Sequence, residues 1–228
     1  MISIGAAVPL SKTQHLLLEA FPQLSELFHR FASLPIRNQA TLGGNVANAS
    51  PIGDMPPVLL ALGANIIADN GSQQRSIAAH QFFTGYRQTA LASDEWICRI
   101  DIPQLKTNER MAAYKISKRM EDDISAVCAI FKITLYDKQQ LLNVSNGIGG
   151  VAATPVSCEA LATQLIGQCW HDKTCLSVGS ELLRNAFNPI DDVRASAHYR
   201  NTVLANLWKR FFYETQASPI QTRVVNYA

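Results

Sequence analysis

The sequence has 228 residues, of which 47% are hydrophobic and 17% charged, and 20 basic against 18 acidic residues leave a net charge of +2. This composition is typical of an ordered globular protein of one or two domains, and the scattered charges argue against binding to nucleic acid or anionic lipid. No apolar run has the length of a membrane span and no basic leader is recognisable, so we expect a cytoplasmic protein.

The five cysteines are odd in number and none is paired as CxxC, a pattern typical of a reducing compartment. We therefore expect small core side chains rather than ligands. Cys169, His171 and Cys175 come nearest to a metal site, but thiolate sites normally have four well-spaced ligands. An iron–sulfur cluster is argued against by the same count, and no metal ligand is predicted.

In chain order, the first predicted elements are helices. Apolar residues at helical spacing predict one or two helices in residues 11–33, with Ser11 as N-cap and Pro22 as a kink or a new start. After a long loop, Pro56 and Gly63 are typical of the first turn and the C-terminal cap of a further helix. The next predicted elements are strands at 64–69 and 75–79, a short helix or turn at 82–88, and an alternating strand at 95–103.

A polar stretch predicts a boundary near Leu105, which divides the chain into residues 1–105 and 106–228. Beyond it the pattern predicts strands at 111–117, 124–137 and 141–149, with a tight connection between the last two. Three helices are expected to follow: Pro155 to Ile166 behind an N-capping Thr154, Asp172 to about Phe187, and Arg194 to about Gln216. Strands followed by helices favour an α+β fold with helices on one face of an antiparallel sheet.

General motif searches do not indicate a conventional acid–base enzyme. The sequence has no GxGxxG after a strand, no GxxxxGK[ST], no HExxH and no GxSxG. The histidines stand alone, at His15, His29, His80, His171 and His198. The charged segment ISKRMEDDIS, residues 116–125, is either a solvated turn or a functional loop.

One stretch has the composition of a ligand cradle. RNQATLGGNVANASPIGD, residues 37–54, has no charge between its ends. Gly43 and Gly44 would allow positive φ angles and close approach of a ligand, and short polar groups are offered by Thr41, Asn45, Asn48 and Ser50. Such a loop suits phosphate oxygens, although an ordinary glycine-rich turn between two helices explains the same pattern.

Three segments together resemble the flavin domain of the molybdenum-containing hydroxylases, the xanthine dehydrogenase family. They are RFASLPIRNQATLGGNVANASPIGDMPP, FFTGYR and YKISKRMEDDISAV, and their order and spacing agree with that family. The chain resembles the C-terminal part of the bacterial xanthine dehydrogenase small subunit, which carries iron–sulfur and flavin domains. The resemblance implies a second FAD-binding subdomain of the PCMH type, followed by the C-terminal antiparallel sheet and helices of the CO dehydrogenase flavoprotein.

The resemblance also implies FAD contacts at matching positions. Thr41, Gly43, Gly44 and Asn45 would meet the pyrophosphate, and Asn48 stands where relatives have a hydroxyl residue. The other implied positions are Phe31 and Ala32 beside the flavin or adenine, Asp54 on the cofactor hydroxyls, Ile97 in an apolar part of the pocket, and Lys115 near the flavin ring. Simpler readings remain, since Phe31 and Ile97 suit a core and Asp54 could cap the following helix. No catalytic residue is predicted on this chain.

The function implied by the resemblance is electron transfer during purine hydroxylation. FAD would receive electrons from iron–sulfur clusters and pass a hydride to NAD, while the molybdenum cofactor and 2Fe-2S clusters lie on other domains or subunits. The implied partners are an N-terminal FAD subdomain, an iron–sulfur domain and a molybdenum-binding large subunit. Because the N-terminal FAD subdomain is not recognisable here, we expect the isolated chain to bind FAD weakly or not at all.

Two alternatives follow from the same residues. The chain could be a docking module that does not bind FAD, or the flavin portion of a hydroxylase for carbon monoxide, aldehydes or nicotinate. Substrate choice is made at the molybdenum site, which these residues do not contain.

Overall fold

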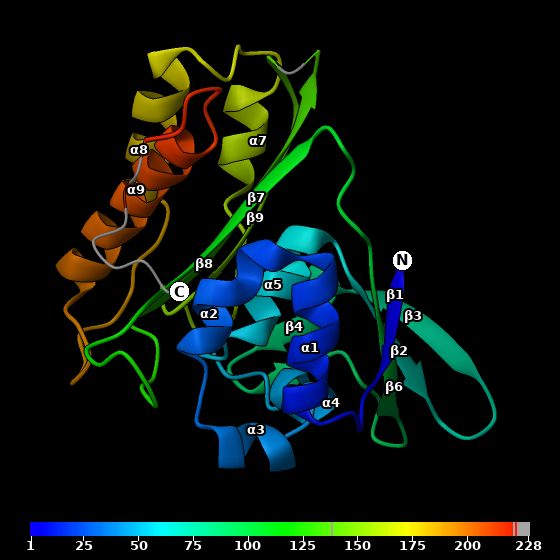
Figure 1. Cartoon of the computed structure of the whole chain (residues 1–228). Coiled ribbons are helices and arrows are strands. Elements are labelled where there is room, and N and C mark those ends of the chain that lie inside the picture. The colour runs from blue at the N-terminus through cyan, green and yellow to red at the C-terminus, as the bar shows by residue number, and fades with distance from the viewer. Residues whose placement is uncertain (138, 221, 223–228) are drawn as a thin grey trace.

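Three antiparallel sheets and the helices packed on them make up the described part of the chain (Figure 1). The computed structural model describes residues 1–137, 139–220 and 222; residue 138, in the predicted tight connection, and 221 and 223–228, in the second predicted unit, lie outside them. The predicted α+β class is confirmed.

The N-terminal helices are shorter and more numerous than expected. Their bounds are α1 (Leu10–Ala20), the 3-10 turn η1 (Pro22–Leu24), α2 (Ser25–His29), α3 (Leu34–Gln39), α4 (Leu42–Ala47) and α5 (Met55–Leu62). Pro22 begins a new turn, as its missing N–H allows. The prediction of Ser11 as N-cap is wrong, because α1 begins at Leu10 and Pro9 is in the cap position. Gly63 ends α5 in the left-handed conformation with φ of 68°, as predicted.

The first sheet has four strands in the order β1-β6-β2-β3. The strand bounds are β1 (Ile2–Gly5), β2 (Asn65–Asp69), β3 (Gln74–Ala78) and β6 (Trp96–Ile102). The β2–β3 hairpin and β6 agree with the predicted strands. The strand β1 was not predicted; it is only four residues long, the lower limit at which alternation indicates a strand.

The segment predicted as a short helix or turn at 82–88 is a tight turn flanked by two short strands, which were not predicted. It follows α6 (Ala79–Phe82) and forms a small hairpin of β4 (Phe83–Gly85) and β5 (Gln88–Thr89). Arg87 takes a positive φ of 54° there, which closes the tight turn.

The three-stranded sheet lies in the middle of the molecule. Its strands are β7 (Glu109–Ile116), β8 (Val127–Tyr136) and β9 (Gln140–Gly149), paired in sequence order. The strand predicted from residue 124 begins three residues later, because 124–126 belong to the β7–β8 loop. Lys115 pairs with Cys128 and Tyr114 with Ala129, so successive residues point to opposite faces.

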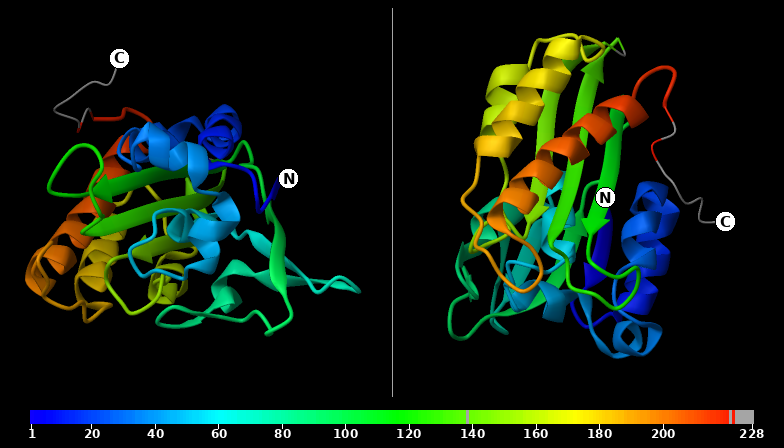
Figure 2. Two further views of the ribbon diagram at one scale, coloured as in Figure 1. Left: turned by 90° about the horizontal axis from the view of Figure 1, so that it is seen from below. Right: turned by 90° about the vertical axis from the view of Figure 1, so that its left-hand side faces the viewer.

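Both faces of this sheet are covered (Figure 2). Met111, Ala113, Cys128 and Ile130 pack into the core of the first half, beneath α5 and α2. The other face carries Tyr114, Phe131 and Ile133 into a second core against the C-terminal helices.

The C-terminal helices are α7 (Glu159–Leu165), α8 (Lys173–Asn185) and α9 (Ala197–Glu214). Asp172 caps α8 by accepting from the Thr174 N–H, and Ser196 caps α9 by accepting from the Tyr199 N–H. The prediction of Thr154 as the cap of the first helix is wrong. Val156 instead forms a β-bridge with Ile148 of β9, so the helix begins only at Glu159.

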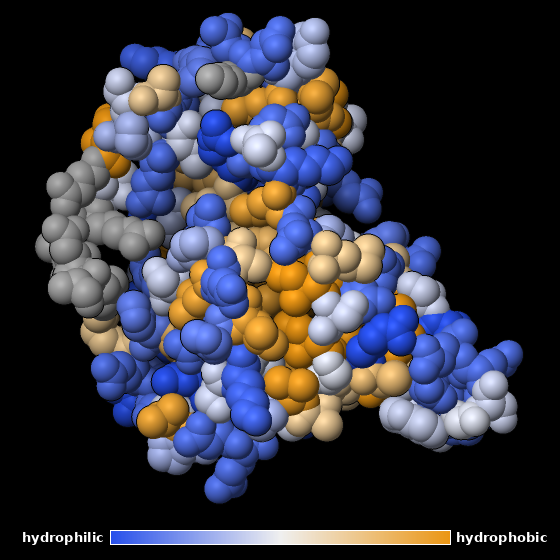
Figure 3. All heavy atoms as spheres, turned by 45° about the vertical axis from the view of Figure 1, so that its right-hand side comes forward, coloured by the Kyte–Doolittle hydropathy of each residue, from blue (hydrophilic) through white to orange (hydrophobic). Residues whose placement is uncertain are grey.

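Surface hydropathy is uneven. Hydrophobic side chains gather in the centre of one face of the molecule, between more polar ends (Figure 3). Within the described residues, no helix combines the length and the apolar character needed to cross a bilayer.

Candidate functional site

A cavity of about 250 Å³ brings together half of the residues that the sequence singled out. Phe31 and Ala32 follow α2, Asn45 lies in α4, Asp54 precedes α5, and Lys115 comes from β7. The remaining lining residues were not predicted individually; they are Ile36, Ile52, Gly53, Asp122, Asp123 and Ile124. The charged segment 116–125 therefore contributes to the cavity wall.

A buried ion pair forms the polar part of the cavity. Lys115 Nζ donates to Asp54 Oδ2 at 2.6 Å, and the side chains are only 2% and 5% exposed. Ser125 Oγ donates to Asp54 Oδ1 at 2.5 Å. Asp54 is in the cap position of α5 without a side-chain cap bond, so capping does not explain this carboxylate. Each of its oxygens keeps a lone pair that could accept from a ligand hydroxyl.

Cys128 lies directly under this ion pair. Its Sγ is 3.9 Å from the main-chain oxygen of Asp54, and the side chain is fully buried. Burial, followed by the nearby Asp54 carboxylate, raises the pKa of the Cys128 thiol well above its ordinary value. The thiol therefore stays neutral and acts as a small core group.

The turn that carries Phe31 has a strained backbone, which hydrogen bonds from Arg37 hold in place. Ala32 takes a positive φ of 50°, which is unfavourable for a residue with a Cβ. Arg37 stabilises the turn, because its Nη1 donates to the oxygens of Phe31 at 2.8 Å and Ala32 at 2.5 Å. Lys115 Nζ lies 5.8 Å from the centroid of the Phe31 ring, close enough for a cation–π interaction. Asp122 also has a positive φ, of 49°. Strained residues of this kind cluster at ligand sites.

The conformation of Gly43 and Gly44 differs from the one predicted. The stretch 37–54 contains the end of α3 and all of α4, and Gly43 and Gly44 are not among the residues with positive φ. The expectation of left-handed glycines is therefore wrong. Gly43 is needed for close packing instead, since a Cβ there would lie 2.5 Å from the Ala6 Cβ.

The first N–H groups of α4 already have protein partners. Gly43 N donates to Ala6 O at 2.9 Å, and Gly44 N to the hydroxyl of Thr41, which is the N-cap, at 3.0 Å. These groups do not form an open nest for phosphate oxygens in this structure. The polar atom that remains is Asn45 Oδ1, which is buried and has no hydrogen-bond partner among the described residues.

The other predicted positions lie outside the cavity lining. Thr41, Gly43 and Gly44 are at the start of α4, and Asn48 is its exposed C-cap. Ile97 is in β6, 8% exposed, and belongs to the first hydrophobic core. The structure thus brings Phe31, Asn45, Asp54 and Lys115 together and leaves Ile97 in a core role.

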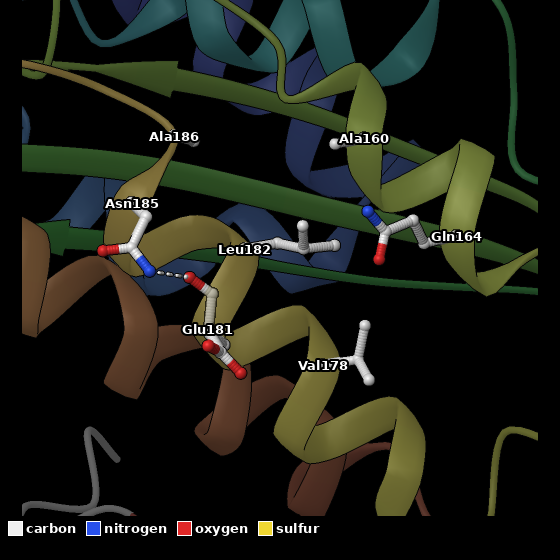
Figure 4. A pocket seen from close by; sticks show the side chains of 7 residues that line it. All are labelled: Ala160, Gln164, Val178, Glu181, Leu182, Asn185 and Ala186. Carbon is white, nitrogen blue, oxygen red and sulfur yellow. Dashed lines mark hydrogen bonds between the residues drawn. The ribbon is translucent and has the colours of Figure 1, made fainter.

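A larger cavity than the candidate site lies elsewhere. It measures about 450 Å³ and lies between α7 and α8, lined by Ala160, Gln164, Val178, Glu181, Leu182, Asn185 and Ala186 (Figure 4). Asn185 donates to the main-chain oxygen of Glu181 at 3.1 Å, and no predicted site residue faces this groove. A further cavity of about 410 Å³ shares Ile52 with the candidate site and is lined also by Pro51, Gly150 and Arg200.

Metal ligands do not converge in the part of the chain that the structure describes. Among residues 1–137, 139–220 and 222, no group of three or more His, Cys, Asp or Glu side chains could hold an ion. Cys175 Sγ donates to the carbonyl of Cys169 at 3.2 Å, and His171 pairs with Gln216. The side chains of Cys175 and His171 thus have other partners.

Comparison with known families divides the chain in two. Residues 1–105 match the FAD binding domain in molybdopterin dehydrogenase, and residues 112–215 match the CO dehydrogenase flavoprotein C-terminal domain. Among curated proteins, the chain is 36% identical to nicotinate hydroxylase hnxS and 33% identical to xanthine dehydrogenase, both of Emericella nidulans. Each alignment covers 90% of this chain but only 16% and 15% of those proteins, so the chain spans about a sixth of their length.

Solved structures share the fold over most of the chain. The CO dehydrogenase of Oligotropha carboxidovorans matches with a TM-score of 0.82 and 28% identity, covering 91% of this chain and 72% of the other. Quinoline 2-oxidoreductase of Pseudomonas putida 86 matches with a TM-score of 0.81 over 95% of this chain and 75% of the other, at 22% identity, which shows the fold alone. The chain therefore belongs to the flavoproteins of the molybdopterin hydroxylase family, with an FAD-binding domain followed by the CO dehydrogenase flavoprotein C-terminal domain.

Proposed function

We propose that this chain is part of the FAD site of a xanthine dehydrogenase-type oxidoreductase, which passes electrons from iron–sulfur clusters through FAD to NAD. The observation that carries the proposal is the cavity in which Phe31, Asn45, Asp54 and Lys115 meet. FAD, when bound, supplies the redox chemistry, and the protein contributes position and electrostatics.

The residues present fit a flavin nucleotide. The orphaned Oδ1 of Asn45 is a buried acceptor without a partner among the described residues, and such a group favours a ligand that donates a hydrogen bond. The carboxylate of Asp54 accepts hydrogen bonds from Lys115 and Ser125, and its remaining lone pairs can accept from cofactor hydroxyls. Phe31 offers an apolar ring surface beside them.

The small volume of the cavity supports the proposal that this chain forms only part of the FAD site. Its volume of about 250 Å³ is below the range of about 300–1,000 Å³ that is usual for small-molecule pockets. We propose that an N-terminal FAD subdomain supplies the opposite wall. The iron–sulfur domain and the molybdenum-binding large subunit are the further partners of this proposal.

The division into residues 1–105 and 106–228 is part of the same proposal, and the two family matches support it. The contacts of Thr41, Gly43, Gly44 and Asn48 with a pyrophosphate remain proposals too, which would require rearranged N–H partners or the use of side chains. Nicotinate is a second candidate substrate, favoured by the 36% identity to a nicotinate hydroxylase.

Titration with FAD tests the proposal. The chain is titrated alone and together with a polypeptide carrying the N-terminal FAD subdomain, and flavin absorbance and fluorescence are followed. We expect weak or no binding alone and saturable binding when the second wall is present. Absence of saturable binding in both cases would instead favour the docking module, and a tight stoichiometric complex of the chain alone would contradict an incomplete site.

The variant Asp54→Asn tests the role of the carboxylate, with Asp94→Asn as its matched control. It removes the anionic acceptor at nearly constant size, so we expect FAD affinity to fall by about tenfold. Asp94→Asn, an exposed carboxylate in the β5–β6 connection, should leave affinity unchanged.

A further inference from the structure

Arg200 is a buried arginine whose role the proposed cofactor contacts do not include. It lies in the first turn of α9 and is 2% exposed, which is unusual for an arginine. Its Nη1 donates to Ala126 O at 2.5 Å and to Gly150 O at 2.9 Å, and its Nη2 donates to Asp192 Oδ1 at 2.6 Å. One guanidinium thus joins the start of β8, the turn after β9 and the α8–α9 loop.

The first of these contacts leads directly to the candidate site. Ala126 follows Ser125, whose hydroxyl donates to Asp54 Oδ1. Ala126 N also donates to Ile116 O at 2.7 Å, which fixes the two ends of the β7–β8 loop to each other. A displacement of Ala126 would therefore move the hydroxyl that orients the Asp54 carboxylate.

The second contact reaches the same carboxylate from the other side. Gly150 has φ of 88° and its N–H donates to Pro51 O at 2.8 Å. Pro51 lies three residues before Asp54, in the segment that forms the cavity wall through Ile52. Arg200 therefore supports both chain segments that hold Asp54 in place.

The third contact keeps the guanidinium itself in position. Asp192 Oδ1 also accepts from the N–H groups of Arg194 at 2.8 Å and Ala195 at 3.0 Å. Burial would raise the pKa of Asp192, but these donors and the charge of Arg200 hold it below its ordinary value. Asp192 thus holds the Nη2 group of Arg200 in place, and the Nη1 group is left pointing at the two main-chain carbonyls.

We propose that Arg200 is a positioning residue of the candidate FAD site, which orients the Asp54 carboxylate through Ala126 and Ser125 and through Gly150 and Pro51. The role in cofactor binding rests on the proposed function. The role in holding the two segments does not, and the two can be tested separately.

The first test needs no cofactor. Arg200→Lys keeps the charge but loses the planar fork that spans three acceptors. Amide hydrogen exchange is measured in the complete chain, and we expect about tenfold faster exchange in residues 50–54 and 124–128, equivalent to about 1.4 kcal/mol of lost local stability.

The matched control is Arg210→Lys in the same helix. Arg210 is also partly buried and paired with carboxylates, but its hydrogen bonds go to Glu26, Glu214 and Thr222, away from residues 50–54 and 124–128. Exchange in those two segments should stay within about twofold of wild type. A uniform increase over the whole chain in Arg200→Lys, or no increase in the two segments, would overturn the proposal. If that variant fails to fold, Asp192→Asn is the milder change, with the same two segments expected to respond.

The second test uses FAD affinity in a double-mutant cycle. It is run with the N-terminal FAD subdomain present, comparing Arg200→Lys, Ser125→Ala and the double variant. If Arg200 acts through Ser125, each single change weakens FAD binding by about tenfold. The double variant then loses much less than the product of the two single factors, about a hundredfold. Independent, multiplying effects would contradict the route through Ser125. Failure of wild type to bind FAD at all would reject the proposed function, while hydrogen exchange would still decide the positioning role.

Discussion

The ion pair of Lys115 and Asp54 is the residue-scale feature with the clearest energetic consequence. Both groups are almost fully removed from water, so each would be strongly destabilising without the other. Their charges compensate, and Ser125 satisfies the second carboxylate oxygen. A flavin ring placed beside Lys115 would therefore feel the pair rather than an isolated positive charge.

The change Lys115→Met should leave Asp54 buried and uncompensated. We expect a loss of about 3–5 kcal/mol in the free energy of unfolding, measured by urea denaturation. The double variant Lys115→Met/Asp54→Asn removes both charges and should recover part of that loss. A double variant less stable than Lys115→Met would show that the ion pair is not the cause.

The same residue also carries a redox hypothesis. A positive side chain near the ring would favour an anionic reduced flavin, so Lys115→Met should lower the flavin midpoint potential in the assembled protein. Since Asp54 compensates the charge at 2.6 Å, we expect the shift to be small. A potential that is unchanged or raised in this variant would reject the hypothesis.

At the scale of elements, α5 packs directly on the backbone of β9. Gly147 faces Pro57, and a Cβ at Gly147 would collide with the main chain of Pro57. Backbone atoms of a helix and a strand cannot move apart locally without disturbing the core around them. The close approach places Asp54, which precedes α5, over Lys115 of the same sheet.

Gly147→Ala should therefore destabilise the protein by about 1–3 kcal/mol or more through overpacking. Gly5→Ala is the matched control in another strand, because its Cβ would be in ordinary contact at 3.7 Å from Val8 Cγ2. Thermal unfolding followed by circular dichroism distinguishes the two. Equal melting temperatures for both variants would contradict the tight contact.

Some elements could be predicted from the sequence and others could not, for physical reasons. The caps Gly63 and Asp172 are local signals, and both predicted helix ends agree with the structure. By contrast, α3 and α4 are six residues each, too short for a hydrophobic period, and Asn and Gly are common in turns. Thr41 as a cap was visible only as a polar residue in a loop.

The candidate site could likewise be predicted only in part from local sequence signals. Asp54 and Lys115 stood in recognisable segments, but their pairing joins residues 61 apart in sequence. Arg37, Ser125 and Arg200 act through hydrogen bonds to main-chain oxygens or carboxylates, which leave no sequence pattern. Local spacing could not reveal the roles of Ser125 and Arg200, because their partners lie 71 and 74 residues away in sequence.

At the scale of the whole molecule, a polar cluster connects the first helices to the last. Arg210 in α9 pairs with Glu26 of α2 at 3.3 Å and with Glu214 at 2.9 Å, and Tyr114 of β7 donates to Glu214 at 2.7 Å. Burial would raise the pKa of Glu214, but hydrogen bonds from Thr222, Tyr114 and Arg210 hold it below its ordinary value of 4.5. The folded state therefore favours the anionic form.

The lowered pKa of Glu214 predicts how the free energy of unfolding depends on pH. The contribution of Glu214 is fully present above about pH 4.5 and is lost as the pH falls through the lower folded value. Glu214→Gln should be less stable than wild type at pH 7, and the difference should shrink toward pH 3. Urea midpoints measured across this range test the prediction, with Glu19→Gln on the exposed side of α1 as a control. A difference that grows in acid would contradict the assignment.

The central sheet β7–β8–β9 has one face in each hydrophobic core. Residues such as Phe131 and Ile130 are neighbours in one strand yet serve opposite cores, so neither core can lose its packing while the other keeps an intact wall. Thermodynamically, the sequence boundary near Leu105 is therefore not a boundary between independent folding units. We expect the two halves to unfold together, and a backbone cut after Leu105 would leave two fragments that remain bound to each other.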